Sequence, residues 1–177
     1  DAPEAALLMN GDLQTDPYGE HFMVQLRRRQ ANDSDYPADG LLVWHVDART
    51  GPDGRFIYDN SYTDHKLLRL MEADGLEEIE QNGSADAGDF FTPGDVFGPD
   101  THPGSSRYDG ASINLLVDAI ADSGQDMAFQ ASLGSGCALF CDAALVATAW
   151  PRSVVSFEGS VTTENCAFDF ATDDALL

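Results

Sequence analysis

The apolar residues of this chain occur in short runs of four to nine residues, separated along the whole length by glycine, proline, asparagine and aspartate. Runs of this size bounded by turn-forming residues are typical of β-strands joined by turns. We therefore predict a mostly β fold, in which an antiparallel β-rich domain carries long loops. Its expected strands cover residues 21–28, 41–47, 55–58, 66–71, 113–120 and 127–133.

One long stretch, residues 75–110, lacks a regular apolar period and is rich in Gly, Asp and Pro, as in "NGSADAGDFFTPGDVFGPDTHPGSS". A loop of that length inside a compact domain is usually functional, braced by a metal, or disordered. Its aromatic residues Phe90, Phe91 and Phe97 indicate that it packs onto the core. The shorter segment "ADSGQD" between the last two expected strands predicts a hairpin turn.

A domain boundary is expected at "LGSGC", where a run of small residues precedes a new set of apolar runs. The first domain would span residues 1–134 and the second 135–177. Further strands are predicted in the second at 142–149, 154–162 and 167–171.

The formal charge of −22, from 31 acidic against 9 basic residues, restricts the partners of the chain. Binding to nucleic acid or to an anionic membrane surface relies on clustered Lys and Arg, and the only basic run here is Arg27-Arg28-Arg29. No apolar run reaches the roughly 18 residues that a membrane span needs. We therefore expect neither nucleic acid nor a membrane as a partner.

Three cysteines near the end of the chain, Cys137, Cys141 and Cys166, favour a disulfide in a secreted, extracellular protein over a zinc site, because no further Cys or His pair lies at zinc-ligand spacing. One cysteine is left without an assigned partner. In such a protein, Asn32 and Asn82 match the acceptor pattern for N-linked glycans.

Five segments follow one another in a recognisable order: "EHFMVQLRR", "GLLVWHVD", "LLRLMEADGL", "GSADAGDFF" and "GASINLLVDAIADSGQDMAFQASL". Together they resemble the region downstream of the catalytic core in the immune inhibitor A family of secreted zinc metallopeptidases. The first segment departs from the family pattern, since Gln25 and Leu26 replace the usual Glu-Asn. The resemblance implies that residues 1–134 are a β-rich metallopeptidase-associated domain.

The final segment, "CALFCDAALVATAWPRSVVSFEGSVTTENCAFDFATDD", resembles the opening of a PKD-like module of immunoglobulin type. This resemblance implies a Cys141–Cys166 bridge, with Cys137 unassigned. Three readable strands, against about seven in a complete module, predict a partial immunoglobulin-like β-sandwich. Its open edge could pair with other copies of the chain, so an extracellular structural subunit that self-assembles by strand complementation is one alternative function.

The zinc chemistry of the family requires His-Glu-x-x-His, and the four histidines, His21, His45, His65 and His102, are far apart with none followed by Glu. We therefore expect zinc only in a catalytic part that this chain lacks. The chain would be the non-catalytic C-terminal portion that supports the catalytic domain, its expected partner, and links it to accessory modules. A further alternative is an accessory polymer-binding module that presents Trp150 and Tyr108.

Two groups of residues are singled out for the site. Asp86, Asp89 and Asp95 lie in a Gly-punctuated loop that could bind a structural calcium ion, although a solvated acidic loop is the alternative. On the apolar strand at 41–47, side chains alternate, which places His45 and Asp47 on one face and Trp44 on the other. We predict a structural role for these three residues, with an ion or interdomain contact as the alternative for the His-Asp pair.

Overall fold

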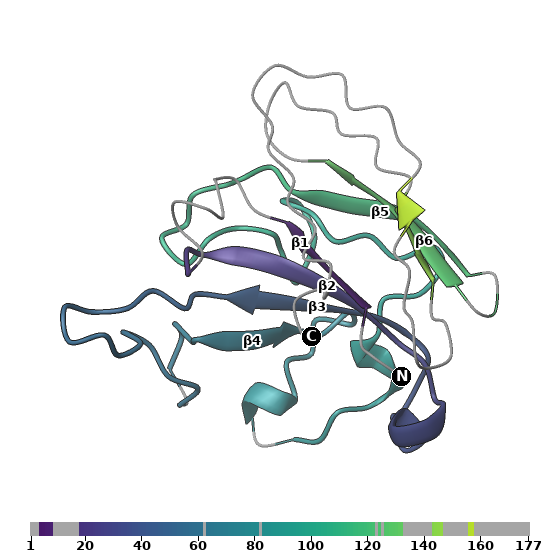
Figure 1. Ribbon diagram of the computed structural model, residues 1–177, viewed down its shortest axis with the longest axis horizontal. Helices are drawn as coiled ribbons and strands as arrows, with labels where there is room; N and C mark the ends of the chain where they lie inside the picture. The colour runs from purple at the N-terminus through teal and green to yellow at the C-terminus, as the bar shows by residue number, and fades with distance from the viewer. Residues whose placement is uncertain are drawn as a thin grey trace, which may run out of the picture.

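The computed structural model describes residues 18–132, apart from 62, 82, 123 and 125, together with the backbone of three strands outside that range. One antiparallel sheet has the order β1 (Glu4–Leu8), β2 (His21–Arg27), β3 (Gly40–Val46) and β4 (Leu68–Met71). The second has the order β5 (Leu116–Asp122), β6 (Asp126–Ser132), β7 (Ala143–Val146) and β8 (Ser156–Phe157). Figure 1 shows the two groups of strands.

The mostly β, antiparallel fold predicted from the sequence is confirmed. In the described part of the chain the helical segments are single 3-10 turns, η1 (Ala31–Asp33), η2 (Ile79–Gln81) and η3 (Ala87–Asp89). The predicted hairpin is also present, since β5 and β6 are adjacent antiparallel strands with Asp122 opposite Met127. The partial sandwich stays a prediction, as does the boundary at 134, because most of residues 133–177 lie outside the described part.

The core lies between the two sheets and follows from the alternation of apolar residues along each strand. From the first sheet, Phe22, Val24 and Leu26 of β2 are buried, and Val24 lies opposite Val43 of β3. The second sheet contributes alternate residues of β5 and β6 to the same cluster: Val117, Met127, Phe129 and Ala131. The sheets therefore bury their apolar faces against each other.

The long loop at 75–110 packs onto this core through its aromatic residues, as predicted. Phe90, Phe91 and Phe97 are all buried, and the Phe97 ring lies edge-on to Phe22 and Phe91 at centroid distances of 5.2 and 5.8 Å. Phe97 also exchanges two backbone hydrogen bonds with Val117, of 2.9 and 2.7 Å. The loop thus runs from the edge of the first sheet, where Phe91 pairs with Leu41, to the β5 edge of the second.

A composite edge completes the first sheet. β4 pairs with β3 up to Met71 opposite Val43, and Phe91 pairs with Leu41, two residues further along the same edge of β3. Phe91 and Leu41 exchange two backbone hydrogen bonds of 2.9 Å. The segment between Met71 and Phe91, which we call the Met71–Phe91 excursion, therefore leaves this edge of the sheet and returns to it.

The strand predicted at 55–58 is not formed. This segment belongs to a projecting hairpin, residues 49–58, which we call the arm; it has a single bridge between Thr50 and Phe56. Phe56 and Ile57 are 52% and 55% exposed, so the apolar run has no sheet face to cover. Figure 1 shows the chain extending beyond the end of β3 at this point.

Two arginines of the basic run form ion pairs within the fold. Arg27 pairs with Asp33 at 2.8 Å, and Arg28 makes two hydrogen bonds to Asp122 at the end of β5. The Arg28–Asp122 pair therefore joins the two sheets.

Candidate functional site

The polar end of β3 is the first candidate site. Leu41 and Val43 face the core, and the alternation continues to His45 and Asp47, which are 3% and 0% exposed. His45 and Asp47 therefore lie on the core-facing side of β3, beyond its apolar residues, and both are buried. Trp44 lies on the opposite face, where its indole N–H donates to Gln25 at 3.2 Å.

Glu20 is the partner of His45, and sequence reasoning did not single it out. Glu20 precedes β2, and the pairing of His21 with Val46 places it beside the end of β3. Its Oε1 shares a 2.8 Å hydrogen bond with His45 Nε2 and accepts the Tyr108 backbone N–H at 2.6 Å, while Oε2 accepts Arg107 Nε–H at 3.1 Å. One buried carboxylate thus joins the end of β3 to the segment around Tyr108.

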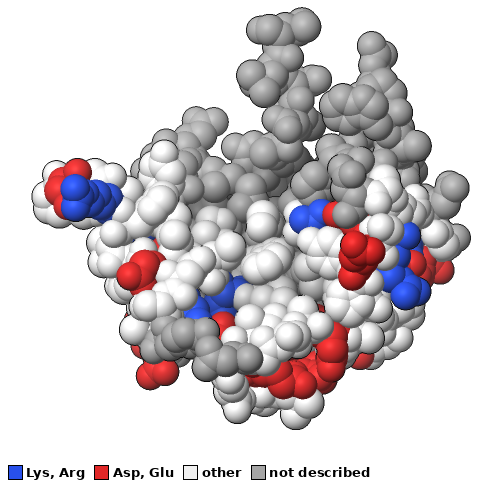
Figure 2. Space-filling model, turned by 90° about the horizontal axis from the view of Figure 1, so that it is seen from below, with Lys and Arg blue, Asp and Glu red and all other residues white. Residues whose placement is uncertain are grey.

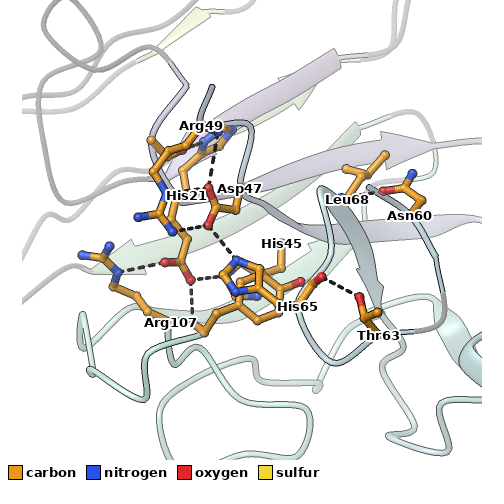
Figure 3. A network of polar contacts seen from close by, with 12 residues as sticks. His21, His45, Asp47, Arg49, Asn60, Thr63, His65, Leu68 and Arg107 are labelled. Carbon is orange, nitrogen blue, oxygen red and sulfur yellow. Dashed lines mark hydrogen bonds and ion pairs between the residues drawn. The ribbon is translucent and has the colours of Figure 1, made fainter. Parts of the chain in front are cut away.

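Asp47 has a separate set of partners (Figure 3). Arg49 donates to both of its carboxylate oxygens, at 2.8 and 2.5 Å, and His65 Nε2 shares a 2.8 Å hydrogen bond with Oδ2. The Asp47 carboxylate is buried, whereas the side chain of Arg49 is 41% exposed. Asp47 therefore connects the base of the arm to the segment before β4.

Both carboxylates have a pKa below the ordinary value. Burial alone acts to raise the pKa of Glu20, but hydrogen bonds from His45, Tyr108 and Arg107 outweigh it. Burial likewise acts to raise the pKa of Asp47, and hydrogen bonds from Arg49 and His65 outweigh it. Each acid is therefore held in its ionised form.

His45 and His65 belong to a stack of five aromatic rings that begins at Phe22 in the core. Successive centroid distances are 4.4, 4.1, 3.9 and 3.5 Å, with interplanar angles of 8° to 20°. In order the rings are Phe22, His45, Tyr108, His65 and Tyr58. Tyr108, which the accessory-module hypothesis places on the surface, thus has both ring faces covered.

The contacts of His45 and His65 hold neighbouring segments together. The Nε2 atoms of His45 and His65 are bonded to carboxylates, and aromatic rings cover both faces of each imidazole. The side chain of His45 is 4% exposed and that of His65 is 28% exposed. A structural role for His45, Asp47 and Trp44 therefore stays our prediction.

The second candidate site is a group of four carboxylates at the base of the Met71–Phe91 excursion, which we call the acidic cluster: Glu72, Asp74, Glu78 and Asp89. One oxygen of each lies within 4.8 Å of the others. Backbone hydrogen bonds from Ala73 to Asp89 and from Asp74 to Gly88 bring the two ends of the excursion together. A Cβ on Gly88 would lie 2.4 Å from Asp74 Oδ2, so a larger residue there would displace that carboxylate from the cluster.

Two members of the acidic cluster are buried without a cationic partner among the described contacts. Glu72 and Asp89 are each 1% exposed. Glu72 accepts the backbone N–H groups of Glu78 and Ile79, and Asp89 accepts that of Asp86. Burial, together with the neighbouring acids, raises the pKa of both carboxyl groups despite these hydrogen bonds. Oxygen-rich, mutually repelling groups of this kind are the ligands that calcium prefers.

Of the three residues predicted to bind calcium, only Asp89 is in the acidic cluster. Asp86 caps η3 by accepting the Gly88 N–H, and Asp95 accepts from the backbone and hydroxyl of Thr92. On the face seen in Figure 2, the largest group of Asp and Glu atoms lies along the lower edge, and smaller groups lie elsewhere beside Lys and Arg atoms. Calcium binding stays a prediction, and the acidic cluster is where the structure would accommodate it.

Calcium is expected to raise the melting temperature of the chain at pH 7, because the cation would relieve the repulsion between Glu72 and Asp89. At a free calcium concentration of about 100 times Kd, binding would add about 2.7 kcal/mol to the free energy of unfolding. Because the folded-state pKa values of Glu72 and Asp89 are raised, ionisation of these carboxyls destabilises the unliganded fold as the pH rises through those pKa values. The rise in melting temperature caused by calcium should therefore be smaller at lower pH.

Scanning calorimetry in calcium and then in excess chelator measures this shift. Glu72→Gln should abolish it, while Asp95→Asn should retain it, because Asp95 lies outside the acidic cluster. Equal melting temperatures in calcium and in chelator would remove the calcium hypothesis.

Several other predicted positions cannot be compared with the structure. Cys137, Cys141, Cys166, Trp150 and Asn82 lie outside the described residues, and so does the side chain of Asn32, whose backbone is part of η1. The predicted Cys141–Cys166 bridge and both glycan sites therefore stay predictions.

Comparison of the chain with protein-family models, with curated proteins and with solved structures gives no match. In the part of the chain that the structure describes, no helix has the length and apolar character needed to cross a bilayer.

Proposed function

We propose that this chain is the non-catalytic C-terminal portion of a secreted, immune-inhibitor-A-like zinc metallopeptidase. Its role would be to support the catalytic domain and to link it to accessory modules such as the PKD-like segment at 135–177. The resemblance to that family is the starting point of the proposal, and the positions of the resembling segments in the fold support it.

The observation that carries the proposal is that the five resembling segments pack together around one core. "EHFMVQLRR" contains β2, "GLLVWHVD" forms β3, and "LLRLMEADGL" contains β4. "GSADAGDFF" supplies η3 with Phe90 and Phe91, and the last segment contains β5 and β6. A resemblance spread over the whole core is what a shared domain requires, whereas a single shared motif could arise in unrelated folds.

The polar residues of these segments are engaged with one another and not with an open catalytic centre. Glu20, His45 and Asp47 are buried in the contacts at the end of β3. Glu72 and Asp89 are buried in the acidic cluster. A supporting domain needs internal hydrogen bonds and ion pairs of this kind, because it must keep its shape while the catalytic part binds and releases substrate.

The purified chain is expected to show no zinc-dependent proteolysis, because it lacks the His-Glu-x-x-His ligands and general base. Casein hydrolysis in the presence of zinc, with and without a zinc chelator, measures this. A known zinc metallopeptidase at the same concentration serves as the positive control. Chelator-sensitive cleavage of casein by the pure chain would overturn the assignment.

The supporting role has its own test. The catalytic domain of the parent protein would be produced alone and joined to this chain, and the loss of peptidase activity on heating would be followed for both. The joined form should survive to a higher temperature. Equal inactivation of the two forms would contradict a supporting role while leaving the chain non-catalytic.

A further inference from the structure

Two loops are attached to the end of the first sheet by the same group of side chains, which we call the latch: Glu20, His45, Asp47, His65 and Tyr108. The first loop carries Arg107 and Tyr108, and Glu20 holds it through the Tyr108 N–H and the Arg107 side chain. The second is the arm, which Asp47 holds through Arg49.

The ring stack makes the two attachments depend on each other. The Tyr108 ring lies between His45, which is bonded to Glu20, and His65, which is bonded to Asp47. Tyr58, at the end of the arm, stacks on the other face of His65 at 3.5 Å. Loss of either carboxylate contact would free a ring on which the other attachment packs.

The charges of the latch and its two arginine partners balance only while Glu20 and Asp47 are ionised. Glu20 and Asp47 face Arg107 and Arg49 respectively, so the four groups sum to zero. If both acids became neutral, two guanidinium groups would remain beside two histidines. The repulsion would then act between the arm and the Tyr108 loop, because each of them carries one of the two guanidinium groups.

The titratable and charged groups around the latch come from every neighbouring segment. Glu20 and His21 lie at the start of β2, His45 and Asp47 at the end of β3, and Arg49 and Tyr58 on the arm. The remaining groups are His65, Lys66, Arg69, Glu80, Arg107 and Tyr108. Lys66 pairs with Glu80 and Arg69 with Glu77, so these cations are already neutralised outside the latch.

We propose that the latch is an acid-sensitive device: protonation of Glu20 and Asp47 releases the Tyr108 loop and the arm together, while the two-sheet core stays folded. The core can persist because it is built from apolar side chains of both sheets, none of which titrates. The latch, in contrast, consists of polar contacts at the margin of that core.

The direction of the pH effect follows from the carboxylates. Both have a folded-state pKa below the ordinary value, so their contacts are fully present above the unfolded pKa values, near 4 for these side chains. The contacts are lost as the pH falls through the lower folded-state values. Burial raises the pKa of Tyr108, which therefore stays neutral throughout this range. Release is expected below a pH of about 4.

Backbone amide resonances of the full chain, followed by NMR from pH 7 to pH 3, test the proposal. The Tyr108 amide donates to Glu20 and that of Arg49 to Asp47, so each reports directly on one acid. The Val24 and Val43 amides report on the core. The proposal predicts that the first two change together at a pH where the core pair is unchanged. A single transition shared by all four amides would overturn it.

Substitutions separate the latch from general effects of acid. The double variant Glu20→Gln/Asp47→Asn mimics the protonated latch and should show the released Tyr108 and Arg49 resonances already at pH 7. Asp53→Asn removes one acid from the exposed tip of the arm, and this variant should show the same pH transition as the natural chain. A double variant whose Tyr108 and Arg49 amides keep the natural pH 7 positions would contradict the proposal. If that variant does not fold, the titration of the natural chain still decides.

Discussion

Replacing Phe97 with alanine is expected to lower the free energy of unfolding by about 3–5 kcal/mol, the range typical of removing a phenylalanine from a packed core. Phe97 is fully buried, and its ring meets Phe22 of the first sheet and Phe91 of the long loop. Its backbone pairs with Val117 of the second sheet. The cavity would thus open where both sheets and the loop meet, and backbone pairing limits how far the surroundings can collapse into it.

Urea denaturation followed by tryptophan fluorescence measures this loss. The matched control is Val96→Ala, at the adjacent position, where the side chain is 43% exposed and truncation should cost no more than about 0.5 kcal/mol. Equal midpoints for the two variants would show that the long loop does not pack into the core as described.

Replacing Glu20 with alanine is the second large effect, with an expected loss of about 3–5 kcal/mol, as for breaking a buried ion pair by removing one partner. The change leaves three donors without an acceptor: the His45 ring, the Tyr108 backbone N–H and the Arg107 side chain. His45 is only 3% exposed, so water cannot readily replace the lost carboxylate there.

The same denaturation experiment measures the Glu20 effect, with Asp53→Ala as the control for removing one negative charge. On the surface of the arm, Asp53 lies 4.0 Å from Arg55 Nε and accepts the Arg55 backbone N–H at 3.1 Å, so its removal should cost no more than about 0.5 kcal/mol. Glu20→Ala should also lose stability relative to Glu20→Gln, because glutamine keeps the volume of the side chain at this buried position. A Glu20→Ala variant as stable as Asp53→Ala would show that Glu20 does not hold the segments together.

The strand content was predictable because each apolar run is bounded by turn residues, and the run at 41–47 gave β3 almost without change. The exception at 55–58 has a physical reason. Alternation and β-branched or aromatic residues favour a strand only where a neighbouring strand and a core are available, and the arm projects beyond both. Whether a short apolar run has a partner is decided by the tertiary fold.

The candidate site was predictable only in part, because its partners are distant in sequence. His45 and Asp47 were identified together from the period of two along one strand. Glu20, 25 residues from His45, reaches it only through the register of β2 with β3. In the acidic cluster, sequence reasoning identified Asp89 but not Glu72, because their proximity depends on Met71 and Phe91 both pairing with β3, opposite Val43 and Leu41.

That composite edge also bears on how the chain could vary in length. Since Met71 and Phe91 are fixed by their pairing with β3 and not by the residues between them, insertions or deletions in the middle of the intervening segment would not shift the register of the sheet. Their main cost would be loop-closure entropy, which rises only slowly with length. The segment is thus a tolerant position for variation in size, provided that the paired backbone groups of Ala73 with Asp89 and of Asp74 with Gly88 are kept.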